Sequence, residues 1–92
     1  MMLWLIWQDD IDEYDTYIDA VVVAPDAELA RRIHPSSMFV WSEELSTWVY
    51  RDGGEAVDYH SWVNIDNVHV ELIGVAMGNM SSRVVCASFR AG

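Results

Sequence analysis

The sequence predicts an α+β fold, with a single antiparallel β-sheet of about four to five strands and one main α-helix packed on one face. Short runs rich in β-branched and aromatic residues, separated by turn residues, indicate the strands. A segment with proline and acids at its start and arginines at its end indicates the helix. The chain has 92 residues, 52% of them hydrophobic, so we expect one small domain over residues 1–92.

Four segments have strand patterns. Leu3–Trp7 is short and continuously apolar, which favours a buried strand. Thr16–Val23 is rich in β-branched residues and follows across an acidic loop, so we expect it to pair antiparallel with the first strand. Val68–Met77 alternates between apolar and polar side chains, and Val84–Arg90 forms the last strand after a break at Gly78-Asn79.

The helix is predicted to begin at Pro25, with Asp26 and Glu28 in its first turn, where carboxylates favour the N-terminal dipole. Two arginines stand in its last turn. The helix should end at His34-Pro35, because proline disfavours the helical conformation of the residue before it. We expect His34 to lie at the helix terminus and to be favoured there by the dipole.

The middle of the chain is less regular. Met38–Trp41 is predicted as a short strand, and Trp48–Arg51 and Ala56–Tyr59 as a hairpin across Asp52-Gly53-Gly54, where the glycines supply positive φ angles. A short helix around Ser42–Leu45 is the alternative interpretation of its first half.

Charge carries the functional signal. The chain has 15 acidic residues against 5 basic ones, all arginine, for a net charge of −10. Five of the acids fall within residues 9–15. Such an excess repels nucleic acid and anionic membranes and attracts basic protein surfaces. The composition therefore predicts a protein-binding function.

The motifs of other functions do not appear. The acidic loop fails as a calcium-binding EF-hand, since Tyr14 falls on a ligand position and Asp15 stands where glycine is needed. The histidines and Cys86 lack the paired spacing of zinc sites. Ser88 lies in a strand pattern without a nucleophile elbow. We therefore expect no enzyme, no cofactor and no metal. The single cysteine, which excludes an intrachain disulfide, fits a cytoplasmic location.

Several strings resemble a family of small uncharacterised phage and prophage proteins. The strings are Tyr14-Asp15-Thr16-Tyr17, Ala20-Val21-Val22-Val23-Ala24, Glu28-Leu29-Ala30-Arg31, Ile33-His34-Pro35, residues 68–76 and residues 85–92. The resemblance covers roughly residues 3–35 and 62–92, and residues 36–61 look like a variable insertion. It implies an architecture without catalytic residues and a location in the bacterial host cytoplasm. Some acidic proteins from similar phage settings inhibit bacterial defence, including anti-CRISPR proteins.

The main functional hypothesis follows from charge and resemblance together. An acidic, phage-encoded inhibitor would bind the basic surface of a nucleic-acid-binding defence protein, for example a CRISPR effector complex, as a DNA mimic. The candidate carboxylates are those of Asp9, Asp10, Asp12, Glu13, Asp15, Asp19, Asp26 and Glu28.

The alternative is a non-enzymatic interaction module, a phage accessory protein that binds through exposed aromatic residues or self-associates. Its candidate anchors are Trp48 and Trp62, because tryptophan is enriched at binding hot spots. A competing explanation is that these rings cover the second face of the sheet.

Overall fold

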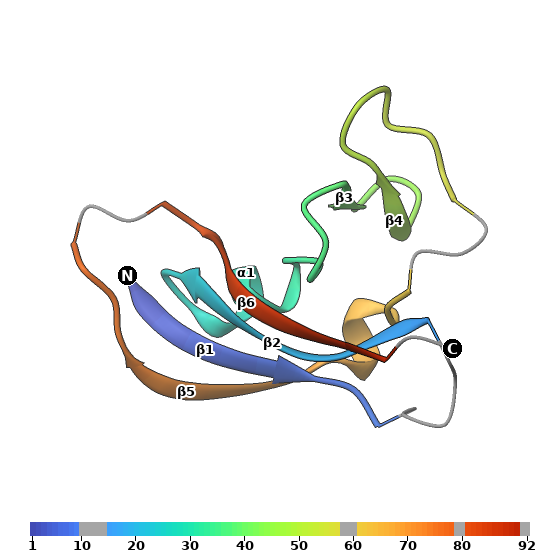
Figure 1. The fold of residues 1–92 in the computed structure, drawn as a ribbon. Helices are drawn as coiled ribbons and strands as arrows, with labels where there is room; N and C mark the ends of the chain where they lie inside the picture. Colours follow the sequence, from blue (N-terminus) through green and yellow to red (C-terminus); the bar gives the residue numbers. More distant parts are fainter. Residues whose placement is uncertain (10–14, 58–60, 79–80, 91–92) are drawn as a thin grey trace.

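The computed structural model describes residues 1–9, 15–57, 61–78 and 81–90. Its main sheet contains the strands β1 (Met2–Trp7), β2 (Thr16–Ala24), β5 (His69–Val75) and β6 (Arg83–Arg90). They lie in the order β5-β1-β2-β6, and each neighbouring pair is antiparallel (Figure 1). The predicted α+β fold, with one antiparallel sheet and a helix packed on it, is confirmed, and all four predicted strands of this sheet form.

The helix α1 (Ala27–Arg31) is shorter than the sequence predicts. It begins two residues after Pro25, because Asp26 serves as the N-cap and its carboxylate accepts a 2.9 Å hydrogen bond from the Leu29 amide. Arg31 donates to the backbone carbonyls of Ile65 and Val68. This arginine therefore fixes the helix against a 3-10 helix, η1 (Ile65–Asn67), that the sequence analysis did not predict.

His34 lies beyond the helix, and the expectation that it stabilises the helix terminus is wrong. Because α1 ends at Arg31, the chain turns inward and buries the imidazole. Its Nδ1 atom accepts a 2.8 Å hydrogen bond from the Ser36 amide. The ring packs edge-on against Trp48, with the ring centroids 5.0 Å apart. An acceptor at Nδ1 corresponds to a neutral imidazole with its proton on Nε2.

Residues 36–57 form a second, two-stranded sheet. Here β3 (Phe39–Ser42) pairs antiparallel with β4 (Thr47–Tyr50). A turn occupies the place of the alternative short helix. The predicted pairing of β4 with the segment that begins at Ala56 is present only as an isolated antiparallel bridge between Val49 and Ala56, while the strand partner of β4 is β3; residues 58–60 lie outside the described residues. Gly53 and Gly54 do adopt positive φ angles, of 88° and 68°.

The core lies between one face of the main sheet and the elements that cover it. The sheet contributes Ile6, Ala20, Val22 and Ala24, and the covering elements contribute Ala30, Trp48, Trp62, Ile65 and Val68. Figure 1 shows β3 and β4 standing to one side of the main sheet. The segment that resembles an insertion therefore supplies a central part of the core.

The opposite face of the main sheet is called the outer face here. Residues that alternate with the core residues point to it, including Leu5 and Trp7 of β1 and Asp19 and Val21 of β2. These four side chains are only half-buried. No residue of the outer face belongs to the core cluster formed by the described residues.

Candidate functional site

One end of the main sheet combines acidic and aromatic side chains. At this end Trp7 is paired in register with Asp19 of β2 on one side and with His69 of β5 on the other. The Trp7 and His69 rings stack, with centroids 5.1 Å apart and an angle of 21° between their planes. Glu71 lies two residues further along β5, so its side chain projects from the same outer face. This arrangement is called the acidic end.

A hollow of about 320 Å³ adjoins the stacked rings. Asp9, Asp66 and His69 supply its charged or titratable groups, and Val63 and Asn67 complete the lining. The 3-10 helix η1 positions Asp66, since the Asn64 side chain caps this helix by accepting a hydrogen bond from the Asp66 amide. Across the hollow, an Asp9 carboxylate oxygen lies 2.7 Å from His69 Nε2.

Most of the described carboxylates of the acidic end make no ion pair, although Arg90 of β6 lies at the same end of the sheet, paired in register with Thr16. Among the residues that the structure describes, Asp19, Asp66 and Glu71 make no ion pair, and Asp9 pairs only with His69. Strands in a sheet are about 4.8 Å apart, so Asp19 and His69, two strands apart, lie roughly 10 Å from each other. Carboxylates that gather at one end of a sheet reinforce one negative potential, which attracts a cationic partner.

The acidic residues selected from the sequence do not gather on one face. Asp9, Asp15 and Asp19 lie near the acidic end, whereas Asp26 and Glu28 follow the far end of β2. Asp26 is engaged as the helix cap, and Glu28 pairs with Arg32 at 3.1 Å. The remaining candidates, Asp10, Asp12 and Glu13, lie outside the described residues. The described candidate carboxylates therefore divide into two groups, one at each end of β2.

The two tryptophans proposed as exposed anchors are buried. Trp48 is 0% exposed and Trp62 is 7% exposed, because both rings fill the core between the main sheet and the covering segments. The competing explanation, in which the rings cover the second face of the sheet, is not what the structure shows either, because both rings share the core cluster with Ala30 of α1 and so cover the same face as the helix. The aromatic side chains that do reach the surface include Tyr50, which is 39% exposed, and Phe89, which is 47% exposed.

Sequence reasoning missed part of the acidic end. The alternation of Val68, Val70 and Leu72 with His69 and Glu71 did place the two polar residues on a wet face, and both are exposed. Leu3–Trp7 was predicted as a buried strand, whereas Trp7 at its end is only half-buried, because a continuous apolar run gives no sign of which side chains face solvent. No sequence pattern indicated that Asp66 belongs to this site, because its position depends on the unpredicted 3-10 helix η1.

Two further observations concern the described residues as a whole. Within the described residues, no three histidine, cysteine, aspartate or glutamate side chains gather as potential metal ligands. In the same part of the chain, no helix has the length and apolar character needed to cross a membrane.

Comparison with known proteins finds no match: no family model fits the chain, and neither a curated protein nor a solved structure is significantly similar to it. The resemblance to phage proteins stays a prediction from the sequence. The class of protein that the fold defines is a small α+β protein, and one end of its main sheet carries several carboxylates.

Proposed function

We propose that this protein is a non-enzymatic, acidic binding protein, an anti-CRISPR-like inhibitor that captures the basic surface of a nucleic-acid-binding host defence protein. The observation that carries the proposal is the acidic end, where Asp9, Asp19, Asp66 and Glu71 lie around the Trp7–His69 stack and, among the described residues, only Asp9 has an ion-pair partner. The phage and defence setting comes from the sequence resemblance alone.

The geometry of the acidic end suits a lysine or arginine side chain. The hollow between Asp9 and Asp66 has room for one such side chain, and the carboxylates would accept hydrogen bonds from its charged head. The apolar stem of that side chain would rest on Trp7, since lysine and arginine bury their methylene groups on apolar surface. Asp19 and Glu71 would receive further cations along the outer face.

A nucleic-acid-binding protein has many such lysine and arginine side chains on the surface that binds phosphates. Its lysines and arginines are arranged for a duplex with one negative charge per about 1.7 Å of axis. A protein that occupies them should therefore compete with DNA, and its binding should weaken as salt rises. Long-range attraction by the net charge of −10 should also speed association at low salt.

The test measures how this protein inhibits binding of a labelled DNA duplex to a purified CRISPR effector complex. The variant Asp19→Asn/Asp66→Asn/Glu71→Gln removes three charges from the acidic end. The control variant Glu44→Gln/Asp52→Asn/Glu55→Gln removes three charges from the second sheet and its loops. We expect the first variant to lose inhibition at least about ten-fold and the control to lose little. The proposal is contradicted if both variants inhibit equally well. It is also contradicted if the effector complex binds this protein and the DNA duplex at the same time.

One observation favours a second candidate, a self-associating interaction module. The edge strands β5 and β6 carry exposed apolar side chains, among them Leu72, Ile73 and Val85. An edge strand with apolar side chains is a template for pairing with a second copy. Sedimentation velocity over a hundred-fold range of concentration tests it, and a constant monomer mass excludes it.

A further inference from the structure

A second cavity, of about 230 Å³, lies between the second sheet and the start of the edge strand β6. Three of the chain's five basic residues line it, namely Arg32, Arg51 and Arg83. None of the described residues that line it carries a carboxylate. In a protein of net charge −10, a cavity lined by arginines and by no acid is a distinct electrostatic environment.

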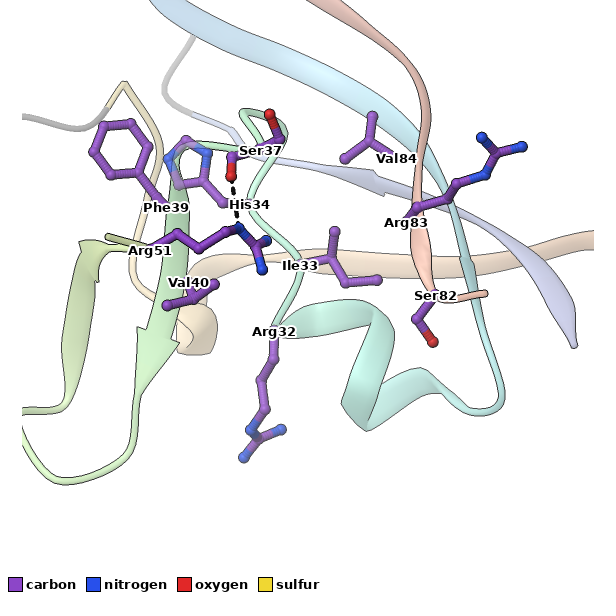
Figure 2. Close-up of a pocket in the computed structure, with 10 residues that line it drawn as sticks. All are labelled: Arg32, Ile33, His34, Ser37, Phe39, Val40, Arg51, Ser82, Arg83 and Val84. Carbon is purple, nitrogen blue, oxygen red and sulfur yellow. Dashed lines mark hydrogen bonds between the residues drawn. The ribbon is translucent and has the colours of Figure 1, made fainter. Parts of the chain in front are cut away.

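The three arginines differ in how their donors are used. Arg32 is engaged by two carboxylates, at 2.6 Å from Glu43 and 3.1 Å from Glu28. Arg51 donates a hydrogen bond from its Nε–H to the Ser37 carbonyl, at 2.9 Å. A guanidinium has five N–H donors, so the two terminal nitrogens of Arg51 keep donors for a ligand. Figure 2 shows the Arg51 guanidinium lying across the cavity, between Ser37 and Ile33.

Arg83 supplies a second cation at the rim. It is exposed and makes no ion pair among the residues that the structure describes. Figure 2 shows its guanidinium turned outward and that of Arg32 directed away from Arg51. Exposed side chains change rotamer within nanoseconds, so the Arg83 head can turn over the cavity when an anion enters.

The rest of the lining is largely apolar. Ile33, Phe39, Val40 and Val84 supply its hydrocarbon surface, and Ser82 adds a hydroxyl near Arg83. An apolar wall beside a guanidinium suits a ligand with an anionic head and a hydrocarbon body. The planar guanidinium fork matches the two oxygens of a carboxylate.

We propose that this cavity binds a small organic carboxylate. Its carboxylate would accept hydrogen bonds from Arg51 and Arg83, and its short apolar body would rest on Ile33, Phe39 and Val84. The volume limits the ligand to one ring or a short branched chain. The proposal stands on residues other than those of the acidic end, so either can fail without the other.

The experiment titrates the protein with benzoate at about 0.15 M salt, where charges more than about 8 Å away are screened. Backbone amide NMR shifts report binding and show whether each variant is folded. Benzamide, which has the same ring without the charge, and inorganic phosphate are titrated in parallel. Arg51→Gln and Arg83→Gln each remove one proposed contact. Arg90→Gln is the matched control, because it removes an arginine from the same strand as Arg83 but from outside the cavity.

We expect benzoate to shift the amides of the cavity segments and benzamide to bind at least about ten-fold more weakly, since the head must be charged. Arg51→Gln should weaken benzoate binding about ten-fold or more, Arg83→Gln by a smaller factor, and Arg90→Gln not at all. If Arg51→Gln does not fold, the benzoate affinity of Arg83→Gln is the measurement that tests the proposal. The proposal is overturned if benzoate gives no saturable shift, if benzamide or phosphate binds as tightly, or if folded cavity variants bind as the wild type does.

Discussion

The indole N–H of Trp48 donates a 2.7 Å hydrogen bond to the backbone carbonyl of Val63, fifteen residues further along the chain. This bond joins β4 of the second sheet to the segment that leads into η1. Because Trp48 is fully buried in the core cluster, the same ring connects both segments to the main sheet. The second sheet is therefore part of the folded unit that positions both candidate sites.

Replacing Trp48 should cost a large part of the free energy of unfolding. We expect Trp48→Ala to lose about 3–5 kcal/mol, as large-to-small substitutions of buried aromatics do. Trp48→Phe should lose about 1–3 kcal/mol, because the Val63 carbonyl loses its donor. Urea unfolding followed by circular dichroism measures both. Tyr50→Ala, an exposed aromatic on the same strand, should stay within about 0.5 kcal/mol, and an equally large loss there would contradict this account.

A buried polar chain ties the start of β2 to residue 61. The Gln8 side chain donates to Thr16 Oγ1 at 2.9 Å and to the Tyr17 carbonyl at 2.6 Å, and the Thr16 hydroxyl donates to the Ser61 carbonyl at 3.1 Å. Thr16→Val should cost about 1 kcal/mol, because Gln8 keeps the Tyr17 carbonyl and Ser61 keeps the Tyr17 amide. Thr16→Ser, which keeps the hydroxyl, should cost less. Amide hydrogen exchange at Tyr17 reports the loosening directly.

Two glycines should respond oppositely to alanine. At Gly74 in β5, an added Cβ would lie 3.5 Å from Leu3 Cδ1, which is an ordinary contact, so Gly74→Ala should be neutral or stabilise by up to about 1 kcal/mol. At Gly53 there is open space but a φ angle of +88°, so Gly53→Ala should destabilise by about 1–2 kcal/mol. Thermal unfolding of the two variants compares them. A destabilised Gly74→Ala would show that this part of the outer face is closely covered.

The ion pair between Arg32 and Glu43 should make the free energy of unfolding depend on pH. The Arg32 hydrogen bond holds the pKa of Glu43 below its ordinary value of 4.5. A carboxyl whose pKa is lowered by folding stabilises the protein above its ordinary pKa, and this contribution disappears as pH falls through the lowered value. Glu43→Gln should therefore be less stable than the wild type at about pH 7, and the difference in stability should shrink as pH falls below the ordinary pKa of a glutamate.

The neighbouring Glu44 provides the control for this pH dependence, since no ion pair is found for it within the described part of the chain. Urea midpoints across the pH range should separate the wild type from Glu43→Gln and leave Glu44→Gln close to the wild type. A gap between the wild type and Glu43→Gln that does not change with pH would assign the effect to packing rather than to charge.

The strands could be predicted because their signals are local. Thr16–Val23 is rich in β-branched residues, and alternation alone separates the exposed His69 and Glu71 from Val68 and Val70, although it fails at Leu72, which is 53% exposed. The helix was harder to bound, because Pro25 and His34-Pro35 gave outer limits while the Asp26 cap and the docking of Arg31 set the actual ends. The partner of β4 was missed, because the pattern of a strand does not state which strand it pairs with.

By itself, the sequence determined the fold class, the strands of the main sheet and an acidic surface, since short-range patterns and charge counts encode these. Only the tertiary structure decided that Trp48, Trp62 and His34 are buried, that the acids divide between two ends of β2, and that three arginines line one cavity. Each of those outcomes depends on contacts between segments far apart in the chain. Such contacts follow from how the whole core packs, which no local pattern records.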